Sequence, residues 1–238
     1  NGEVVTPLDR DDLNRIIIRL AEEGVESVAV CLIHAYANPA HERRIGELLA
    51  RELPGVEISL SSDVLPIFRE YERTLATAFN ATVQPIAGRY VGKLTAGLSR
   101  RGIAAPFFIM KSNGGVFPPA EAARQPVHLA LSGPAAGARG AAHVGRIAGL
   151  PDLVTIDMGG TSADVALIRG GEPEMTAAGR VGAFPLALPM IDIHTIGAGG
   201  GSIAHIDQTG ALRVGPESAG ADPGPAAYGK GGRRPTVT

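Results

Sequence analysis

Tryptophan is absent from this sequence, and cysteine occurs once, at Cys31. A single cysteine excludes an internal disulfide, and because Cys31 lies in a strand-like apolar run we interpret it as a small buried hydrophobic residue. Apolar runs such as Val28 to Ile33 are far too short to span a bilayer. The first residues are polar, so no signal peptide is visible. We therefore expect a cytoplasmic protein with no membrane partner.

Neither sign of charge is in excess, because the formal net charge is −2. This balance excludes the broad basic surface that attracts nucleic acids, so we expect no nucleic-acid partner. Hydrophobic residues make up 45% and charged residues 19%, which is typical of globular proteins. The 238 residues are enough for one large or two modest domains.

Glycine, in contrast, is abundant, with 32 residues. So many glycines indicate tight turns or close backbone approaches, including those that hold phosphates. The chain starts at Asn1 and ends at Thr238 within an apolar and polar alternation that has no closing element. We expect it to be an internal segment of a longer protein.

Helix-like and strand-like segments alternate along the chain, which predicts an α/β fold. The first segments expected are a helix from Thr6 to Gly24, a strand at 25–33, a helix opened by Asn38-Pro39, and a strand at 56–60.

The longest helical period covers residues 70–101 and is interrupted by Pro85. Proline removes a helical hydrogen bond, so we expect a kink or two helices meeting at this point. Near residue 75 the sequence changes from charged to mainly apolar and small residues. This change predicts a domain boundary, with domains at 1–75 and 76–238.

Short strands, small residues and turns make up the rest of the chain. Ser132-Gly133-Pro134 is expected to begin a helix that ends near Gly149, with the Ser132 hydroxyl as its N-cap. The remaining expected segments are a short strand at 106–110, the turn Ser112-Asn113-Gly114-Gly115, strands at 153–157, 164–168 and 192–196, and an ordered loop at 215–238.

The sharpest motif runs from Val154 to Ile168: a strand ends at Asp157, a glycine turn follows, and a second strand returns from Asp164. Glycines leave backbone N–H groups free to converge on a phosphate. The carboxylate at a strand end can bind a magnesium-ligated water or orient a nucleophile. The turn residues expected to contact phosphate are Gly159, Gly160, Thr161 and Ser162. An ordinary hairpin with a glycine turn is the competing interpretation.

A second glycine cluster spans Gly197 to Ser202 and superficially resembles a dinucleotide fingerprint. That fingerprint requires a helix after the glycines, whereas the following residues, 203–206, are strand-like, so we exclude it. The loop could still present unhindered N–H groups to a nucleotide or a developing oxyanion, or be purely structural. The near match to a P-loop at 224–231 is rejected because Gly231 stands where Ser or Thr belongs.

Asp192 and His194 lie two residues apart on a predicted strand, so their side chains share one face. The pair could hold a cation, but two ligands do not make a site. A satisfied buried pair is the alternative interpretation.

Several of these segments, in this order, resemble the A subunit of the hydantoinase/oxoprolinase family, which includes N-methylhydantoinases, 5-oxoprolinases and related acetone carboxylase subunits. The resemblance rests on six blocks: 35–42 (AYANPAHE), 112–115 (SNGG), 132–137 (SGPAAG), the hairpin containing Asp157, 192–202 (DIHTIGAGGGS) and 214–225 (VGPESAGADPGP).

The resemblance implies an actin-like ATPase (ribonuclease H-like) fold, incomplete here, and ATP-driven opening of a cyclic amide through phosphorylation of its oxygen. It implies ATP and Mg2+ as cofactors, a hydantoin or 5-oxoproline as the cyclic-amide substrate, and a B-type subunit or domain as partner. It makes 1–75 the end of the family's N-terminal domain and 76–238 the start of its catalytic domain. The family's first phosphate hairpin is missing, so the segment alone is expected to be inactive.

Carried over by position, the resemblance assigns one phosphate and magnesium hairpin, a nucleotide or substrate loop, and a further cleft turn. The catalytic residues are Asp157 and Asp164, with Asp157 as magnesium ligand; the hairpin contacts are Gly159, Gly160 and Thr161; the loop is Gly199, Gly200, Gly201 and Ser202; and the turn is Ser112, Asn113, Gly114 and Gly115. Ala163 and Ala227 depart from the family's usual threonine and cysteine, which leaves phosphate contacts at the first position in doubt. An ATP-dependent carboxylase subunit and a non-catalytic nucleotide-binding module remain the alternatives.

Overall fold

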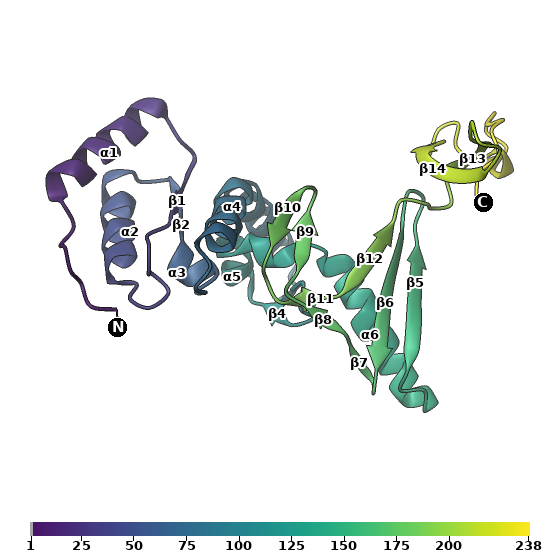
Figure 1. Ribbon diagram of the computed structural model, residues 1–238, viewed down its shortest axis with the longest axis horizontal. Coiled ribbons are helices and arrows are strands. Elements are labelled where there is room, and N and C mark those ends of the chain that lie inside the picture. The colour runs from purple at the N-terminus through teal and green to yellow at the C-terminus, as the bar shows by residue number, and fades with distance from the viewer. Residues whose placement is uncertain (1) are drawn as a thin grey trace. The chain divides into compact units, whose positions relative to one another are not determined.

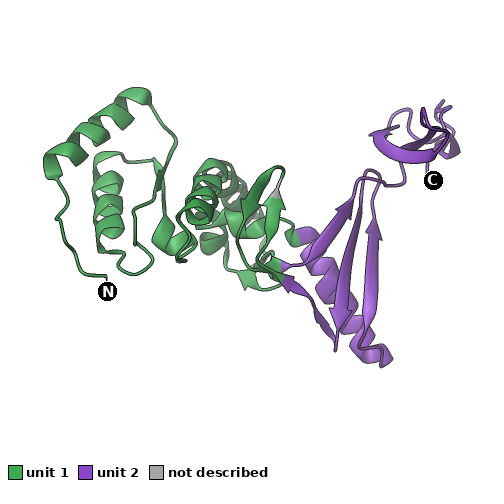
Figure 2. Cartoon of the chain, viewed as in Figure 1, with its two compact units in different colours: residues 1–132, 176–190 green, residues 133–175, 191–238 purple. Residues whose placement is uncertain are grey.

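A computed structural model describes residues 2–238 as two compact units (Figure 2). Unit 1 comprises Asn1–Ser132 and Thr176–Met190, and unit 2 comprises Gly133–Met175 and Ile191–Thr238. Both helices and strands occur in each unit, which confirms the α/β prediction. The predicted division into domains at residue 75 concerns sequence domains and stays a prediction.

Unit 1 starts with two helices around a parallel pair of strands. Its elements are α1 (Arg10–Glu23), β1 (Ser27–Val30), α2 (Ala40–Glu52), β2 (Glu57–Leu60), α3 (Ser61–Val64), α4 (Glu70–Arg100), β3 (Ile109–Met110), β4 (Val116–Phe117), α5 (Pro119–Arg124), the 3-10 helix η1 (Pro126–Leu129), β9 (Gly179–Val181) and β10 (Phe184–Leu186) (Figure 1). Strands β1 and β2 are parallel neighbours, with Ser27 opposite Glu57.

Helix α1 ends at Gly24, as the sequence predicts, but begins at Arg10 and not at Thr6. Asp9 caps its start, accepting hydrogen bonds from the N–H groups of Asp11 and Asp12 at 2.9 and 3.1 Å. Gly24 ends it with φ of 62°, a left-handed conformation that glycine adopts without steric penalty. The core beneath α1 consists of Leu13, Ile17, Val30, Ile45, Leu49 and Leu53.

A fully buried carboxylate joins the first strand to the next helix layer. Glu42 Oε1 accepts hydrogen bonds from the N–H of Leu32 (2.8 Å) and the hydroxyl of Ser61 (2.6 Å). Its Oε2 accepts a third, from the N–H of Ser62 at 2.8 Å. A buried charge is tolerated when hydrogen bonds replace its hydration, and Glu42 ties three chain segments together in this way.

Helix α4 is one continuous helix of 31 residues with Pro85 inside it, so the prediction of two helices meeting there is wrong. Proline costs the helix one hydrogen bond. The turns just before it are held by a buried amide network: Asn80 Nδ2 donates to Ser59 Oγ (2.9 Å), and Gln84 Nε2 donates to Glu57 Oε2 (3.1 Å). These contacts to β2 stabilise the helix across the interruption.

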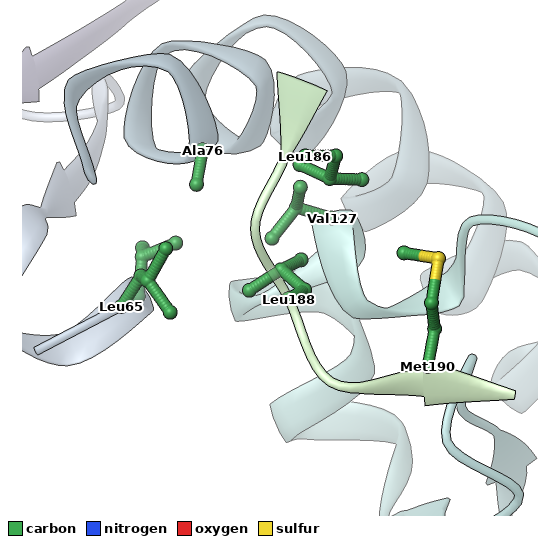
Figure 3. Packing of buried hydrophobic residues seen from close by; sticks show 7 residues of the cluster. Leu65, Ala76, Val127, Leu186, Leu188 and Met190 are labelled. Atoms are coloured by element: carbon green, nitrogen blue, oxygen red, sulfur yellow. The ribbon is translucent and has the colours of Figure 1, made fainter. Parts of the chain in front are cut away.

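A second core brings residues 184–190 back onto α4. Figure 3 shows Leu186, Leu188 and Met190 along one segment, facing Val127. The complete cluster is Val64, Leu65, Ala76, Val127, Leu186, Leu188 and Met190. Side chains far apart in the sequence thus share one apolar interior.

Unit 2 is built on an antiparallel sheet of order β12-β6-β5, with β7 also paired to β6. Its elements are α6 (Ser132–Ala148), β5 (Leu153–Met158), β6 (Ala163–Arg169), β7 (Glu172–Pro173), β12 (Ile193–Ile196), β13 (Ser202–Ile206), β14 (Leu212–Ser218) and the 3-10 helix η2 (Ala226–Tyr228), while β8 (Met175–Thr176) and β11 (Met190–Ile191) lie where the chain passes between units. This confirms the predicted strand–turn–strand hairpin and the helix from Ser132. Since Ser132 is itself helical, its interpretation as the N-cap is wrong by one residue.

Helix α6 packs along one face of this sheet (Figure 1). Its Ala135 and Ala138 meet Ala166 of β6 and Ile191 in a small apolar core. The small residues of the helix allow this close packing, as the sequence indicates.

The expectation of an ordered loop at 215–238 is wrong for its first residues. Strand β14 continues through Gly215 and Pro216 to Ser218 and pairs antiparallel with β13. A two-stranded sheet leaves an outer edge on each strand, where proline is tolerated because no N–H is needed.

Within the described residues, none of the helices combines the length and the apolar character needed to cross a membrane.

Gly145→Ala should destabilise unit 2 by about 1–3 kcal/mol, because a Cβ there would lie 2.5 Å from Leu153 Cδ1 and 2.8 Å from the Leu150 carbonyl oxygen. Gly140→Ala on the same helix is the matched control, since its Cβ would meet nothing within 4 Å. That variant should be neutral or gain up to about 1 kcal/mol from helix propensity. Urea unfolding of both variants measures the difference, and equal midpoints would contradict the packing described.

Candidate functional site

Two carboxylates face each other at the end of the central hairpin of unit 2. Asp157 of β5 and Asp164 of β6 are direct register partners, as are Thr155 and Ala166. Because strand side chains alternate between faces, these four residues share one face of the sheet. Ala166 packs against α6, so the carboxylates lie on the side of the sheet that carries the helix.

A hollow of about 230 Å³ lies between this face and α6. Its lining comprises Pro134, Gly137, Ala138, Ala141, Thr155, Ile156, Asp157, Asp164, Val165, Ala166 and Ile193. The first turns of α6 contribute Pro134 and Gly137, so the hollow lies toward the N-terminal, electropositive part of the helix. Asp157 and Asp164 are the only acidic groups in this lining.

The two carboxylates differ in their hydrogen bonds. Asp164 Oδ1 accepts a hydrogen bond of 2.6 Å from the hydroxyl of Thr195, which is its register partner on β12. Among the described residues Asp157 has no side-chain hydrogen bond, and neither carboxylate has a lysine or arginine within ion-pair distance. Like charges directly opposite on neighbouring strands repel, so this arrangement favours a bound cation.

The donor set fits a magnesium ion. Mg2+ takes oxygen ligands and is usually held by one or two carboxylates together with waters and substrate phosphates. The hollow offers two carboxylates, the hydroxyl of Thr155 is hydrogen-bonded to the backbone of Ala166, and the lining contains no histidine or cysteine. Among residues 2–238 no group of three or more His, Cys, Asp or Glu side chains is placed to hold a metal ion. These residues therefore do not form the four-ligand site that is typical of structural zinc.

The turn of the hairpin, which we call the tip, comprises Gly159–Ser162. It is closed by a hydrogen bond of 2.9 Å from the Gly159 N–H to the Ser162 carbonyl. In the described part of the chain, no protein acceptor is found for the N–H groups of Gly160, Thr161 and Ser162. Around a Cβ at Gly160 there is open space to 4 Å. The position of Gly160 is open, whereas Gly199 lies against the nitrogens of Thr161 and Ser162, and contact of these amides with phosphate stays a prediction.

The tip is held by the second glycine cluster, Gly199–Ser202, which we call the glycine loop. The N–H of Gly200 donates to the Gly159 carbonyl (2.9 Å), and the N–H of Gly201 donates to the Gly160 carbonyl (2.7 Å). A Cβ at Gly199 would lie 2.6 Å from the Gly159 carbonyl oxygen and equally close to the Thr161 and Ser162 nitrogens. Only glycine allows this approach of one backbone to another.

The expectation of unhindered N–H groups in the glycine loop is wrong. Besides the two bonds to the tip, the Gly199 N–H donates to Ser202 Oγ and the Ser202 N–H donates to the Gly199 carbonyl, both at 2.9 Å. All four amides are thus engaged within the protein, and direct ligand contact by these residues stays a prediction. Strand β13 begins at Ser202, in agreement with the exclusion of a dinucleotide fingerprint.

The turn Ser112-Asn113-Gly114-Gly115 forms between β3 and β4 of unit 1. Its buried Ser112 donates through both N–H and hydroxyl to the His128 carbonyl, at 2.7 and 2.6 Å. Burial first, and then the charge of Lys111, lowers the pKa of His128. Because the hairpin belongs to unit 2, a role of this turn in the same site stays a prediction.

Asp192 and His194 are both exposed, so the interpretation as a buried pair is wrong. His194 neighbours Thr195 on β12 and therefore points to the opposite face of the sheet from the carboxylates. A metal role for these two residues stays a prediction.

Burial raises the pKa of the Cys31 thiol, which agrees with a structural residue and not with a nucleophile.

Sequence reasoning missed Thr195, whose hydroxyl is the protein partner of Asp164. Alternation along β12 could have indicated it, because it places Thr195 on the same face as the apolar Ile193, near the end of the strand. Its pairing with Asp164 depends on register between strands about 30 residues apart, which a single sequence does not give.

The chain is similar to two family models and to several known proteins. Family models described as "Hydantoinase/oxoprolinase" and "Hydantoinase/oxoprolinase N-terminal region" match residues 73–238 and 1–53. The chain is 39% identical to the caprolactamase subunit alpha of Pseudomonas jessenii over its full length, and covers 34% of that protein. It is 36% identical to the 5-oxoprolinase of Saccharomyces cerevisiae, with 98% of the chain and 18% of the relative covered.

Two solved structures are similar to the chain as well. The crystal structure of the ATP-dependent caprolactamase from Pseudomonas jessenii superposes with a TM-score of 0.83 at 37% identity, over 100% of this chain and 34% of that one. A nucleotide-free structure of acetone carboxylase gives a TM-score of 0.74 at 29% identity, over 98% and 33%. The chain thus spans about a third or less of the length of the relatives it matches.

Gly199→Ala should displace the tip, because its Cβ would overlap three backbone atoms that cannot rotate away. We expect a loss of about 1–3 kcal/mol in the stability of unit 2 and faster amide hydrogen exchange at Gly200 and Gly201, whose N–H groups donate to the carbonyls of the tip. Gly197→Ala is the control, since its Cβ would meet nothing within 4 Å. Hydrogen exchange followed by mass spectrometry tests both; unchanged protection of the Gly200 and Gly201 amides in Gly199→Ala would contradict the docking.

Proposed function

The chain belongs to the hydantoinase/oxoprolinase family, and we propose that it carries one phosphate- and magnesium-binding half of an ATP-dependent enzyme that opens cyclic amides. The observation that carries this proposal is the carboxylate pair, Asp157 and Asp164, set beside a glycine tip with free N–H groups. Opposed carboxylates without a protein cation favour Mg2+, and free amides favour phosphate. Together they favour a Mg2+–nucleotide.

We propose an actin-like ATPase (ribonuclease H-like) fold for the catalytic part. Support comes from the antiparallel strands β5, β6 and β12 in consecutive order, from the glycine turn between the first two, and from the helix packed on one face. In this proposal unit 2 supplies one of the two phosphate hairpins of the fold.

In the proposed site each group has a separate task. Gly160, Thr161 and Ser162 would donate backbone N–H groups to phosphate oxygens, and the hydroxyls of Thr161 and Ser162 could add to them. Asp157, which has no protein partner, would hold Mg2+ directly or through water, with Asp164 beside it. The bound ion would neutralise charge on the transferring phosphoryl group.

The proposed reaction uses ATP as a substrate. The amide oxygen of the ring attacks the γ-phosphorus; a new P–O bond forms while the bond to ADP breaks. Phosphorylation makes the ring carbon electrophilic; water adds to it, the ring C–N bond breaks with a proton going to the leaving nitrogen, and a second water hydrolyses the resulting acyl phosphate to carboxylate and inorganic phosphate. The net products are the ring-opened amino acid, ADP and inorganic phosphate. The tip and the carboxylate pair would act by orienting phosphate and stabilising charge, the main contributions to catalysis of phosphoryl transfer.

A carboxylase role is the alternative. The acetone carboxylase structure superposes over 98% of this chain, and the acetophenone carboxylase gamma subunit of Aromatoleum aromaticum is 33% identical to it. In that case the phosphoryl group would activate a ketone or bicarbonate. Several relatives are named as subunits, so we also propose a partner subunit, of the B type, for the whole protein.

Asp157→Asn, in the full-length enzyme with its partner, should lower kcat by at least roughly 100-fold, because the amide cannot supply the charge that holds Mg2+. The matched control is Asp152→Asn, at the other end of the same hairpin. Asp152 accepts a hydrogen bond from the Gly170 N–H (2.9 Å), which asparagine can retain. Ring opening is followed together with ADP release, with and without Mg2+-ATP. Full activity of Asp157→Asn, or ring opening without nucleotide, would remove the proposed role.

Labelled bicarbonate separates the two acceptors. A ring-opening enzyme releases ADP in step with loss of the cyclic amide and incorporates no label. Incorporation of labelled carbon into a ketone, with no cyclic amide consumed, would favour the carboxylase alternative.

A further inference from the structure

Thr195 lies at the end of β12, directly opposite Asp164 of β6. Its hydroxyl donates to Asp164 Oδ1 at 2.6 Å, the only side-chain hydrogen bond of either carboxylate within the described range. We propose that Thr195 is a positioning residue, whose hydroxyl fixes the Asp164 carboxylate so that Asp157 and Asp164 bind one divalent cation together. This inference rests on the proposed function of the site.

Because of this hydrogen bond, the two carboxylates would have different roles in binding the ion. A short bond from a hydroxyl to a charged oxygen is strong, and it leaves Asp164 Oδ2 available to the ion. Without it, repulsion from Asp157 would favour rotation of Asp164 away from the hollow. Asp157, which has no partner, can follow the ion, while Asp164 provides a fixed point.

Threonine suits this task because its branched Cβ restricts χ1 and holds the hydroxyl in place. Strand β12 is itself paired to β6 along Ile193–Ile196, so the donor and the acceptor are held by one ladder. Three residues beyond Ile196 the chain reaches Gly199, which packs on the tip. The same strand therefore supports both the carboxylate pair and the amides beside it.

A purely structural role for the hydroxyl is a weak explanation. Thr195 is exposed, and in the described residues its hydroxyl has no other protein partner. Thr195→Val keeps the shape and the strand propensity, and loses only the donor. Thr195→Ser keeps the donor and loses a methyl group.

The test uses the full-length enzyme with its partner subunit and Mn2+ as the probe ion. Free Mn2+ is measured by electron paramagnetic resonance, in the presence of a non-hydrolysable ATP analogue. Thr195→Val should weaken Mn2+ binding about tenfold, the range found when a residue supporting a metal ligand is removed. Thr195→Ser should bind within about twofold of the wild type. The Mg2+ concentration for half-maximal activity should shift in parallel. Thr195→Ala replaces the valine variant if the latter does not fold.

The same substitution in an Asp164→Asn background shows whether Thr195 acts through Asp164. We expect Thr195→Val to change Mn2+ affinity there by less than about twofold. An unchanged affinity in the single variant, or an equal tenfold loss in both backgrounds, would overturn the positioning role. If instead the wild-type enzyme neither binds Mn2+ nor needs ATP, the proposed function itself fails; if it does both and only Thr195→Val behaves as wild type, the positioning role alone is overturned.

Discussion

The close contact of two glycine turns is the constraint on which unit 2 depends. The carbonyls of Gly159 and Gly160 accept the N–H groups of Gly200 and Gly201, and no Cβ fits at Gly199. Because the carbonyls of the tip are bound on one side, its free N–H groups are presented as a fixed set. A turn that is already ordered would lose less conformational entropy on binding the proposed phosphate.

This contact also explains why the chain needs two glycine clusters of different kinds. At the tip, glycine at position 160 leaves the space around the backbone empty, which suits an incoming anion. In the glycine loop, the missing side chains make room for protein backbone instead. The two clusters look alike in the sequence, yet the first provides free amides and the second uses all of its own.

Local patterns predicted the elements well because each depends on neighbouring residues. Gly24 ends α1, and the strand that begins at Leu153 is followed by the turn at Gly159. Small residues indicated the helix that packs on the sheet, α6. Several failures involve partners elsewhere in the chain. Pro85 does not divide α4, since Asn80 and Gln84 anchor the helix to β2. Strand β14 forms because β13 is available to pair with it. Likewise the alignment of Asp157 with Asp164 was foreseeable from the hairpin, whereas the pairing of Thr195 with Asp164 was not.

The size and lining of the hollow separate the shared chemistry from the choice of substrate. At about 230 Å³ it is smaller than the roughly 300–1,000 Å³ of typical ligand pockets, so in the proposed site it would hold a phosphate with its cation and not a whole nucleotide. Its two carboxylates would bind a hard metal ion in the proposed site, a feature that phosphoryl transfers share. Nothing in that lining distinguishes a ring amide from a ketone. If the hollow binds only the phosphate and the ion, as proposed, the acceptor is selected by groups beyond it, which agrees with similarity to relatives named for caprolactam, oxoproline and acetone.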